Sequence, residues 1–151
     1  MKNILILLFM IMSSTSVSAA EKATDKVRLA LNKYAWEKRQ LIVFAPSYEH
    51  RQYQLFRKLE AEFRDEFEER KLHSWHVIGN DPVKLDNTVH AGITNGISSQ
   101  DFRKTYNVSK NEFRVLLIGY DQGEKLRQEK VNIDYLFSEI DQMPMRIQEM
   151  Q

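Results

Sequence analysis

The chain has 151 residues, no cysteine, and 22 basic against 21 acidic side chains, which gives a formal net charge of +1 at pH 7. The absence of cysteine excludes thiol exchange, thiolate peroxidase and disulfide isomerase chemistry, because each of these needs a sulfur nucleophile. The balanced charge argues against a nucleic-acid binder, which needs a clustered basic face, and against polybasic attachment to anionic membranes.

The first twenty residues have the layout of a secretory signal peptide. Lys2 supplies their only charge, residues 4–12 form an unbroken apolar run, and the small-residue stretch 13–20 ends in Val-Ser-Ala or Ser-Ala-Ala. The apolar run is about half of the roughly 18 to 20 residues that span a bilayer. We therefore expect residues 1–20 to be removed and residues 21–151 to form a single periplasmic or secreted domain with no stable membrane anchor. A retained anchor is the alternative.

A helix and a strand should open the mature chain. Thr24 or Asp25 can cap a helix in which Val27 and Leu31 recur at helical spacing. Residues 40–45 form a short continuous apolar run, which is typical of a strand that is covered on both faces.

The next segment completes a βαβ unit. Residues 48–70 predict one long helix with a single apolar face, whose members recur at spacings of three and four: Phe56, Leu59, Phe63 and Phe67. Residues 72–78 predict a second strand, parallel to the first and joined to it by a right-handed connection. Residues 79–98 have the composition of a loop, within which a short strand or turn has room.

Two further elements follow the loop. Ser98 or Ser99 can cap a short helix that runs to Tyr106. Residues 113–120 form the strongest strand pattern in the chain.

The chain then predicts a hairpin and a last helix. Residues 121–123 make a turn in which Gly123 is suited to positive φ, and residues 124–129 return as an antiparallel partner. A final helix begins at Asn132 or Asp134. This order of elements predicts an α/β, thioredoxin-like fold with a central mixed sheet of about four strands flanked by helices.

Three strings of residues carry a resemblance to a known family. They are Trp36-x-x-Arg39-x-Leu41-x-x-Phe44-Ala45-Pro46, Leu117-Ile118-Gly119-Tyr120-Asp121-x-Gly123, and Ile140-Asp141-x-Met143-Pro144-Met145-Arg146-x-x-Glu149-Met150. Together they resemble the DUF4174 family, a largely bacterial domain of unknown function that is similar to domains of sushi-repeat extracellular matrix proteins. The resemblance covers roughly residues 31–150 and implies a thioredoxin-like or peroxiredoxin-like fold. Lys71 departs from the family pattern, in which an aspartate is expected.

A thioredoxin-like fold implies that the reactive position of its relatives lies just after the first strand, here at residues 46–51. The free N–H groups and the dipole at a helix N-terminus attract anions. We expect a small polar or anionic ligand to be held there by Ser47, Tyr48, His50 and Arg51, with Ser47 as the helix cap. The alternative is a capped helix with a solvated loop.

Arg39 and Arg146 belong to the two strongest strings and are further ligand-binding candidates. Either guanidinium could hold a carboxylate or phosphate through two hydrogen bonds. The alternative is an ion pair with Asp121, Asp141 or Glu149 that ties the C-terminal segment to the sheet.

Pro144 either closes the final helix or opens a further short turn. The methionines around it, Met143, Met145 and Met150, are expected to fill gaps in the core. A partner surface is the alternative role for them.

The sequence predicts neither a metal site nor a cofactor. His73 and His76 are three residues apart, a spacing that places two side chains on opposite faces of a strand. No HExxH motif and no Cys/His set accompanies them. Ser47 also lacks the Gly-x-Ser-x-Gly surroundings of a hydrolytic nucleophile.

We therefore expect an exported, redox-inactive, non-enzymatic domain that binds an extracellular protein or an envelope component around the N-terminus of the long helix. That hypothesis predicts exposed aromatic or Met side chains at this end. The alternative is a thiol-independent enzyme with a polar site at the same helix N-terminus, which predicts a closed polar pocket with a group of perturbed pKa. A plain structural role predicts neither feature.

Overall fold

The computed structural model describes residues 18–86 and 96–151. The predicted signal peptide, apart from its last three residues, and residues 87–95 of the predicted loop lie outside this description. The described elements are α1 (Ala19–Asn32), β1 (Arg39–Ala45), α2 (Arg51–Glu62), α3 (Arg64–Glu69), β2 (Leu72–Ile78), β3 (Lys84–Leu85), α5 (Ser99–Tyr106), β4 (Arg114–Ile118), β5 (Glu124–Gln128), α6 (Ile133–Asp141) and α7 (Pro144–Glu149).

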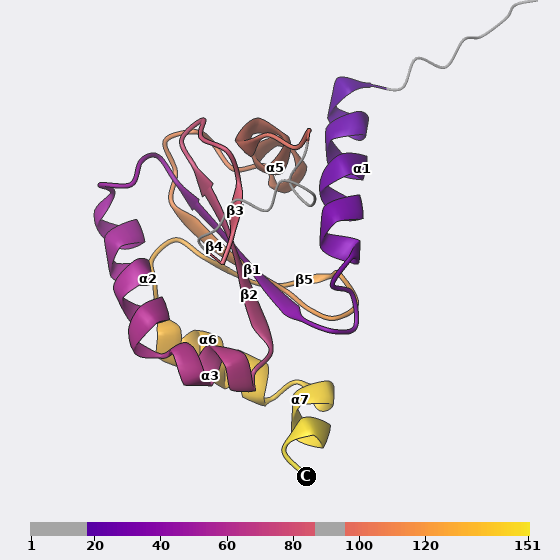
Figure 1. Ribbon diagram of the computed structural model, residues 1–151, viewed down its shortest axis with the longest axis vertical. Coiled ribbons are helices and arrows are strands. Elements are labelled where there is room, and N and C mark those ends of the chain that lie inside the picture. The colour runs from indigo at the N-terminus through magenta and orange to yellow at the C-terminus, as the bar shows by residue number, and fades with distance from the viewer. Residues whose placement is uncertain (1–17, 87–95) are drawn as a thin grey trace, which may run out of the picture.

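The strands form one open mixed sheet in the order β3-β2-β1-β4-β5 (Figure 1). β1 and β2 are parallel, and the other neighbouring pairs are antiparallel. This is the α/β, thioredoxin-like layout that the sequence predicts, with five strands rather than about four. The additional strand is β3, which has only two residues and pairs with Trp75 and His76 near the middle of β2.

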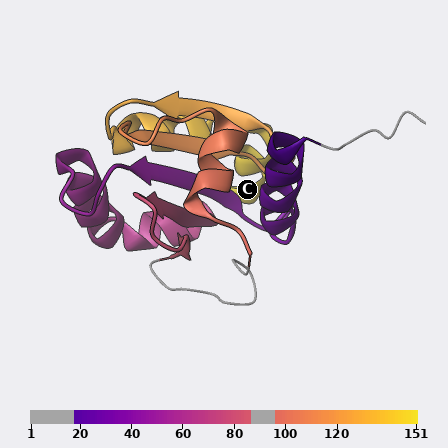
Figure 2. The same cartoon turned by 90° about the horizontal axis from the view of Figure 1, so that it is seen from above.

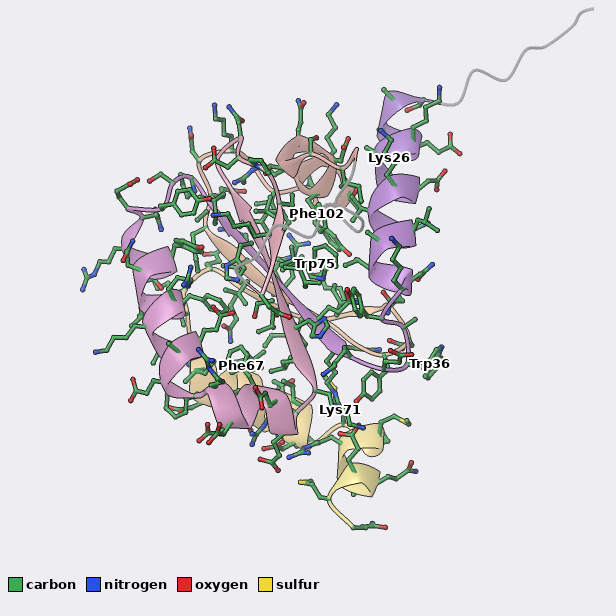
Figure 3. All side chains as sticks on the ribbon, in the orientation of Figure 1. Lys26, Trp36, Phe67, Lys71, Trp75 and Phe102 are labelled. Carbon is green, nitrogen blue, oxygen red and sulfur yellow. The ribbon has the colours of Figure 1, made fainter. Side chains whose placement is uncertain are left out.

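Helices cover both faces of the sheet, as the view from above shows (Figure 2). One core lies under α2, α3 and α6 and contains Tyr53, Phe56 and Leu136. The other lies under α1 and α5, where Trp75 packs against Phe102 (Figure 3). Because the central strand β1 contributes to both cores, all seven of its residues are buried: the apolar residues 41–45, as predicted, and also the polar Arg39 and Gln40.

Helix α1 begins earlier than the expected caps Thr24 and Asp25. Ser18 is its N-cap and accepts a hydrogen bond from the backbone N–H of Ala20 at 3.2 Å. The buried residues of α1 begin at Ala23, one turn before Val27. The helix therefore has one more packed turn at its N-terminal end than the sequence predicts. Among the described residues, no helix is both long and apolar enough to cross a membrane.

The long helix predicted over residues 48–70 is two helices that meet at Phe63. This residue leaves helical geometry, with φ −102° and ψ 32°, and is both the C-cap of α2 and the N-cap of α3. The change of direction lets Phe63 and Phe67 both meet the ring of Phe137 on α6, at centroid distances of 6.0 and 5.7 Å. The aromatic stripe therefore faces one core, as predicted, but it is divided between two helices.

Local signals account for most of the remaining boundaries. Ser98 caps α5 in a capping box with Asp101, and Asn132 caps α6. The β4–β5 turn differs in detail, because Gln122 rather than Gly123 takes positive φ, at 64°. Pro144 opens α7, which is one of the two outcomes expected for it.

Candidate functional site

The structure separates the six predicted ligand residues into two groups. Arg39 begins β1 and shares the carboxylate of Glu149 with Arg146, so these two arginines lie together. Residues 47–51 follow the opposite end of β1. A seven-residue strand spans about 20 Å, so the two groups do not form one site.

At the N-terminus of α2, Ser47 is not the helix cap. The N-cap is His50, which makes no side-chain capping bond within the described part of the chain. The Ser47 hydroxyl instead accepts from the backbone N–H of Glu49 at 3.3 Å, because residues 47–50 form a turn before the helix starts.

Most of the other predicted ligand side chains at this end are packed. The ring of Tyr48 lies edge-on to Tyr53, with the ammonium of Lys84 4.8 Å from its centroid. His50 stacks on Phe113 at a centroid distance of 5.6 Å and an interplanar angle of 8°. Of the predicted ligand residues here, only Arg51 is exposed.

Arg39 is 1% exposed and sits in a polar network at the other end of β1. Its Nη1 donates to the carbonyl of Arg70 at 2.9 Å, to the Tyr120 hydroxyl at 3.1 Å and to Glu149 Oε2 at 3.1 Å. The Tyr120 hydroxyl donates to Glu149 Oε1 at 2.6 Å. Burial and this bond raise the pKa of Tyr120 to about 12. For Glu149, burial opposes ionisation, but the bonds from Tyr120 and Arg39 outweigh it and lower the pKa.

Arg146 ties α7 to α3 and α6. Its Nε donates to Asp141 Oδ1 at 3.2 Å, and its Nη1 and Nη2 donate to the backbone and side chain of Glu69. Asp141 also accepts from Arg70 at 2.6 Å. These are the Asp141 and Glu149 contacts that the structural alternative expects; Asp121, its third candidate, instead binds Lys125. The ammonium of Lys71 lies 3.5 Å from Glu149.

A buried polar chain runs from the core to the surface beside β2. His76 is fully buried; its Nδ1 lies 3.2 Å from the Tyr53 hydroxyl and its Nε2 lies 3.5 Å from Glu60 Oε1. Burial alone would raise the pKa of Glu60, but its interactions with His76, Ser74 and Arg57 outweigh burial and lower it. The carboxyl is therefore held ionised.

His73 points to the other face of the sheet, as the strand spacing predicts. It lies edge-on to Tyr34, and its Nε2 is 3.8 Å from Asp86 Oδ2. Within residues 18–86 and 96–151, no group of three or more His, Asp or Glu residues is arranged to hold a metal ion.

The side chain of Glu60 lines a cavity of about 510 Å³ at the edge of the sheet. We call this cavity the edge pocket. It lies between α2, α3 and the first half of β2. Its lining residues are Lys38, Arg57, Glu60, Ala61, Arg64, Phe67, Glu68, Leu72, His73, Ser74 and Asp86. The edge pocket lies beside the C-terminal end of α2, not at the N-terminal end where the enzyme alternative expects a cavity.

The exposed aromatic and Met side chains also lie away from the N-terminus of α2. Trp36, in the turn between α1 and β1, is 67% exposed and has a φ of 65°, and its side chain points away from the body of the domain (Figure 3). Met145 and Met150 are exposed on α7, against the expectation of core packing, whereas Met143 packs against the core. The short α7 has its inward positions filled by Arg146 and Glu149, which leaves its other side chains to solvent.

Three residues around the edge pocket were missed as a group by the sequence reasoning. Glu60 occupies the polar side of an amphipathic helix, where acids are ordinary, and Asp86 lies in a loop-like stretch. His76 gave the one available signal, since a titratable residue in a strand requires a partner when it is buried. That partner comes from another element and cannot be read from local spacing.

Comparison with known proteins gives one match. The model of a family described as a domain of unknown function, DUF4174, matches residues 30–149. No curated protein and no solved structure matches the chain. The matched range runs from the end of α1 to the last residue of α7 and includes the edge pocket and both groups of predicted ligand residues.

Proposed function

The chain belongs to the DUF4174 family, a domain of unknown function, and we propose that it is an exported domain that binds a protein or another envelope component without thiol redox chemistry. The observation that carries the proposal is the edge pocket. Ligand sites are typically concave, with volumes of roughly 300–1,000 Å³ and a few convergent polar groups. The edge pocket, at about 510 Å³, combines an apolar floor with fixed charged groups.

The burial pattern of α1 supports export to the periplasm or beyond the cell. Residues 18–22 are all exposed, and Ala23 is the first buried residue of the described chain. Cleavage after Ala19 or Ala20 would therefore remove the Ser18 cap but no part of the core. A signal peptide needs such a boundary, because the domain must fold after the segment is gone.

Two observations support a redox-inactive domain. The chain has no cysteine, and the segment after β1 carries Pro46, Ser47 and Tyr48 at the position where thioredoxin-like relatives carry their reactive group. Partial burial of Tyr48 and His50 against aromatic neighbours gives this segment a packing role. Ligand binding by Ser47, Tyr48, His50 and Arg51, or by Arg39 and Arg146, stays a prediction, and the proposal places the ligand in the edge pocket instead.

The proposal is tested by photo-crosslinking in envelope extract. A photoreactive amino acid replaces Arg64 at the rim of the edge pocket, Arg51 at the N-terminus of α2, or exposed Lys110 before β4 as a matched control. We expect a discrete crosslinked species from position 64 that position 110 does not give. Absence of any discrete species from positions 51 and 64 would contradict a binding role, and thiol-dependent reductase or peroxidase activity would contradict the redox-inactive part.

A further inference from the structure

The charged groups of the edge pocket are arranged by depth. Glu60 is its most deeply placed acid, with a side chain that is 15% exposed, while its partner Arg57 is 41% exposed. The two form an i,i+3 pair with Arg57 Nε 3.5 Å from Glu60 Oε2. Because the Arg57 side chain is this exposed, the ion pair contributes at most about 1 kcal/mol to stability, and a ligand can displace Arg57 from Glu60.

Glu60 is also held from behind the pocket. His76 is 0% exposed and lies against Oε1 of Glu60, and the Tyr53 hydroxyl lies against the other ring nitrogen of His76. Both Tyr53 and His76 are part of the packed interior. The carboxylate is therefore presented to the cavity with its orientation set before any ligand arrives, which reduces the entropy that binding must remove.

A second carboxylate, that of Asp86, also lines the cavity, and its Oδ2 lies 3.8 Å from Nε2 of His73. Asp86 Oδ1 accepts from the backbone N–H of Ser74 at 2.9 Å, and the backbone N–H of Asp86 donates to the carbonyl of Ser74 at 2.8 Å. These two bonds end the pairing of β3 with β2. Ser74 thus lies between Asp86 and Glu60, and its hydroxyl also stabilises the Glu60 carboxylate.

The floor and the rim complete the chemistry. Phe67 and Leu72 are buried apolar side chains in the lining, and Figure 3 shows Phe67 on α3 directed toward the sheet. Arg64 and Glu68 are exposed on the rim. A suitable ligand group has a positive charge that pairs with the carboxylates and an aliphatic stem that packs along Phe67.

We propose that the edge pocket binds the cationic group of a peptide segment, with Glu60 as its counter-ion and Asp86 as the second acceptor. This inference rests on the proposed binding function and names its ligand class. The group is an ammonium or guanidinium, whether from the N-terminus of a peptide or from a Lys or Arg side chain. The peptide backbone, with its carbonyl oxygens, then meets the cationic rim at Arg57 and Arg64.

The test uses the mature protein and short synthetic peptides followed by amide chemical shifts. The probes are a capped tripeptide with a central lysine, the same peptide with acetyl-lysine, and a tripeptide of neutral residues with a free N-terminus. We expect shifts at Ala61, Leu72 and Ser74 for the first peptide and weaker binding, by about tenfold or more, for its acetylated form. The third peptide distinguishes an N-terminal ammonium from a side-chain source.

A matched pair of variants localises the effect. Glu60→Gln keeps the shape of the side chain and removes its charge, whereas Glu62→Gln makes the same change on the exposed side of α2, outside the pocket lining. We expect Glu60→Gln to weaken binding of the lysine peptide by about tenfold and Glu62→Gln to leave it unchanged.

Equal affinity of the lysine and acetyl-lysine peptides for the wild-type protein, together with no binding of the free-N-terminus peptide, would overturn the inference, and these comparisons need no variant to fold. Equal affinity of wild type and Glu60→Gln would overturn it as well. If position 64 crosslinks to an envelope component while none of the peptides binds, the proposed function stands and the cationic ligand class is wrong.

Discussion

Replacing Glu149 by glutamine tests the network that fastens the C-terminal helix to the sheet. The carboxylate accepts from Arg39 at 3.1 Å and from Tyr120 at 2.6 Å, and Arg39 and Arg146 are only 1% and 3% exposed. Glutamine keeps one acceptor oxygen but turns an NH₂ group toward a buried donor. The variant therefore leaves buried guanidinium charge without its counter-ion.

The size of the effect follows from that geometry. Breaking a buried ion pair costs about 3–5 kcal/mol. Because the Glu149 side chain is 16% exposed and glutamine retains an acceptor, we expect a loss below that range, about 2–3 kcal/mol. With a urea m-value of about 1.5 kcal/mol/M, the unfolding midpoint falls by roughly 1.3–2 M.

Urea unfolding followed by fluorescence of the buried Trp75 measures this loss. The control is Glu62→Gln, an exposed residue outside the network, which should change stability by less than about 0.5 kcal/mol. A loss for Glu149→Gln that is no larger than the control's would refute the view that this carboxylate holds α7 in place.

The remaining predictions concern titration and local conformation. The pKa values of Glu149 and Asp141 are lowered in the folded protein, so both carboxylates contribute stability above pH 4.5 that is lost as the pH falls through their folded pKa values. The urea midpoint should therefore decrease on acidification, and a midpoint that rises would contradict this. Tyr120→Phe should remove one phenolate transition with a midpoint near pH 12 from the ultraviolet titration, and loss of one near pH 10 would be inconsistent with the network. Trp36→Gly should raise stability by about 1 kcal/mol in the same urea assay, because glycine adopts positive φ without strain and the indole is 67% exposed; an unchanged or lower midpoint would contradict this. Ser98→Ala should cost about 1 kcal/mol through loss of the α5 capping box, and an unchanged urea midpoint would show that the cap is dispensable.

Periodicity was a sound guide to the fold because the sheet is buried on both sides. The apolar runs of β1 and β4 and the capping residues Ser98 and Asn132 act locally, and their elements could be predicted. The break at Phe63 could not, because Phe137, the ring that Phe63 packs against, lies on another helix. The spacing of the aromatic residues in the sequence is the same whether the segment forms one helix or two.

The candidate site was harder to predict than the fold. Asp141 and Glu149 could be named from the sequence among three possible partners of Arg39 and Arg146, because buried guanidinium groups require carboxylates, but the third, Asp121, binds Lys125. The edge pocket could not be assembled in this way. Glu60, Ser74 and Asp86 come from three elements, and their convergence depends on where β3 stops pairing with β2.

Photo-crosslinking from position 64 in envelope extract tests the central claim most directly. The account predicts a discrete crosslinked partner from the rim of the edge pocket, absent at position 110 and diminished by an excess of the lysine peptide. An equal pattern of crosslinks from positions 64 and 110, unchanged by the peptide, would contradict a binding site in the edge pocket.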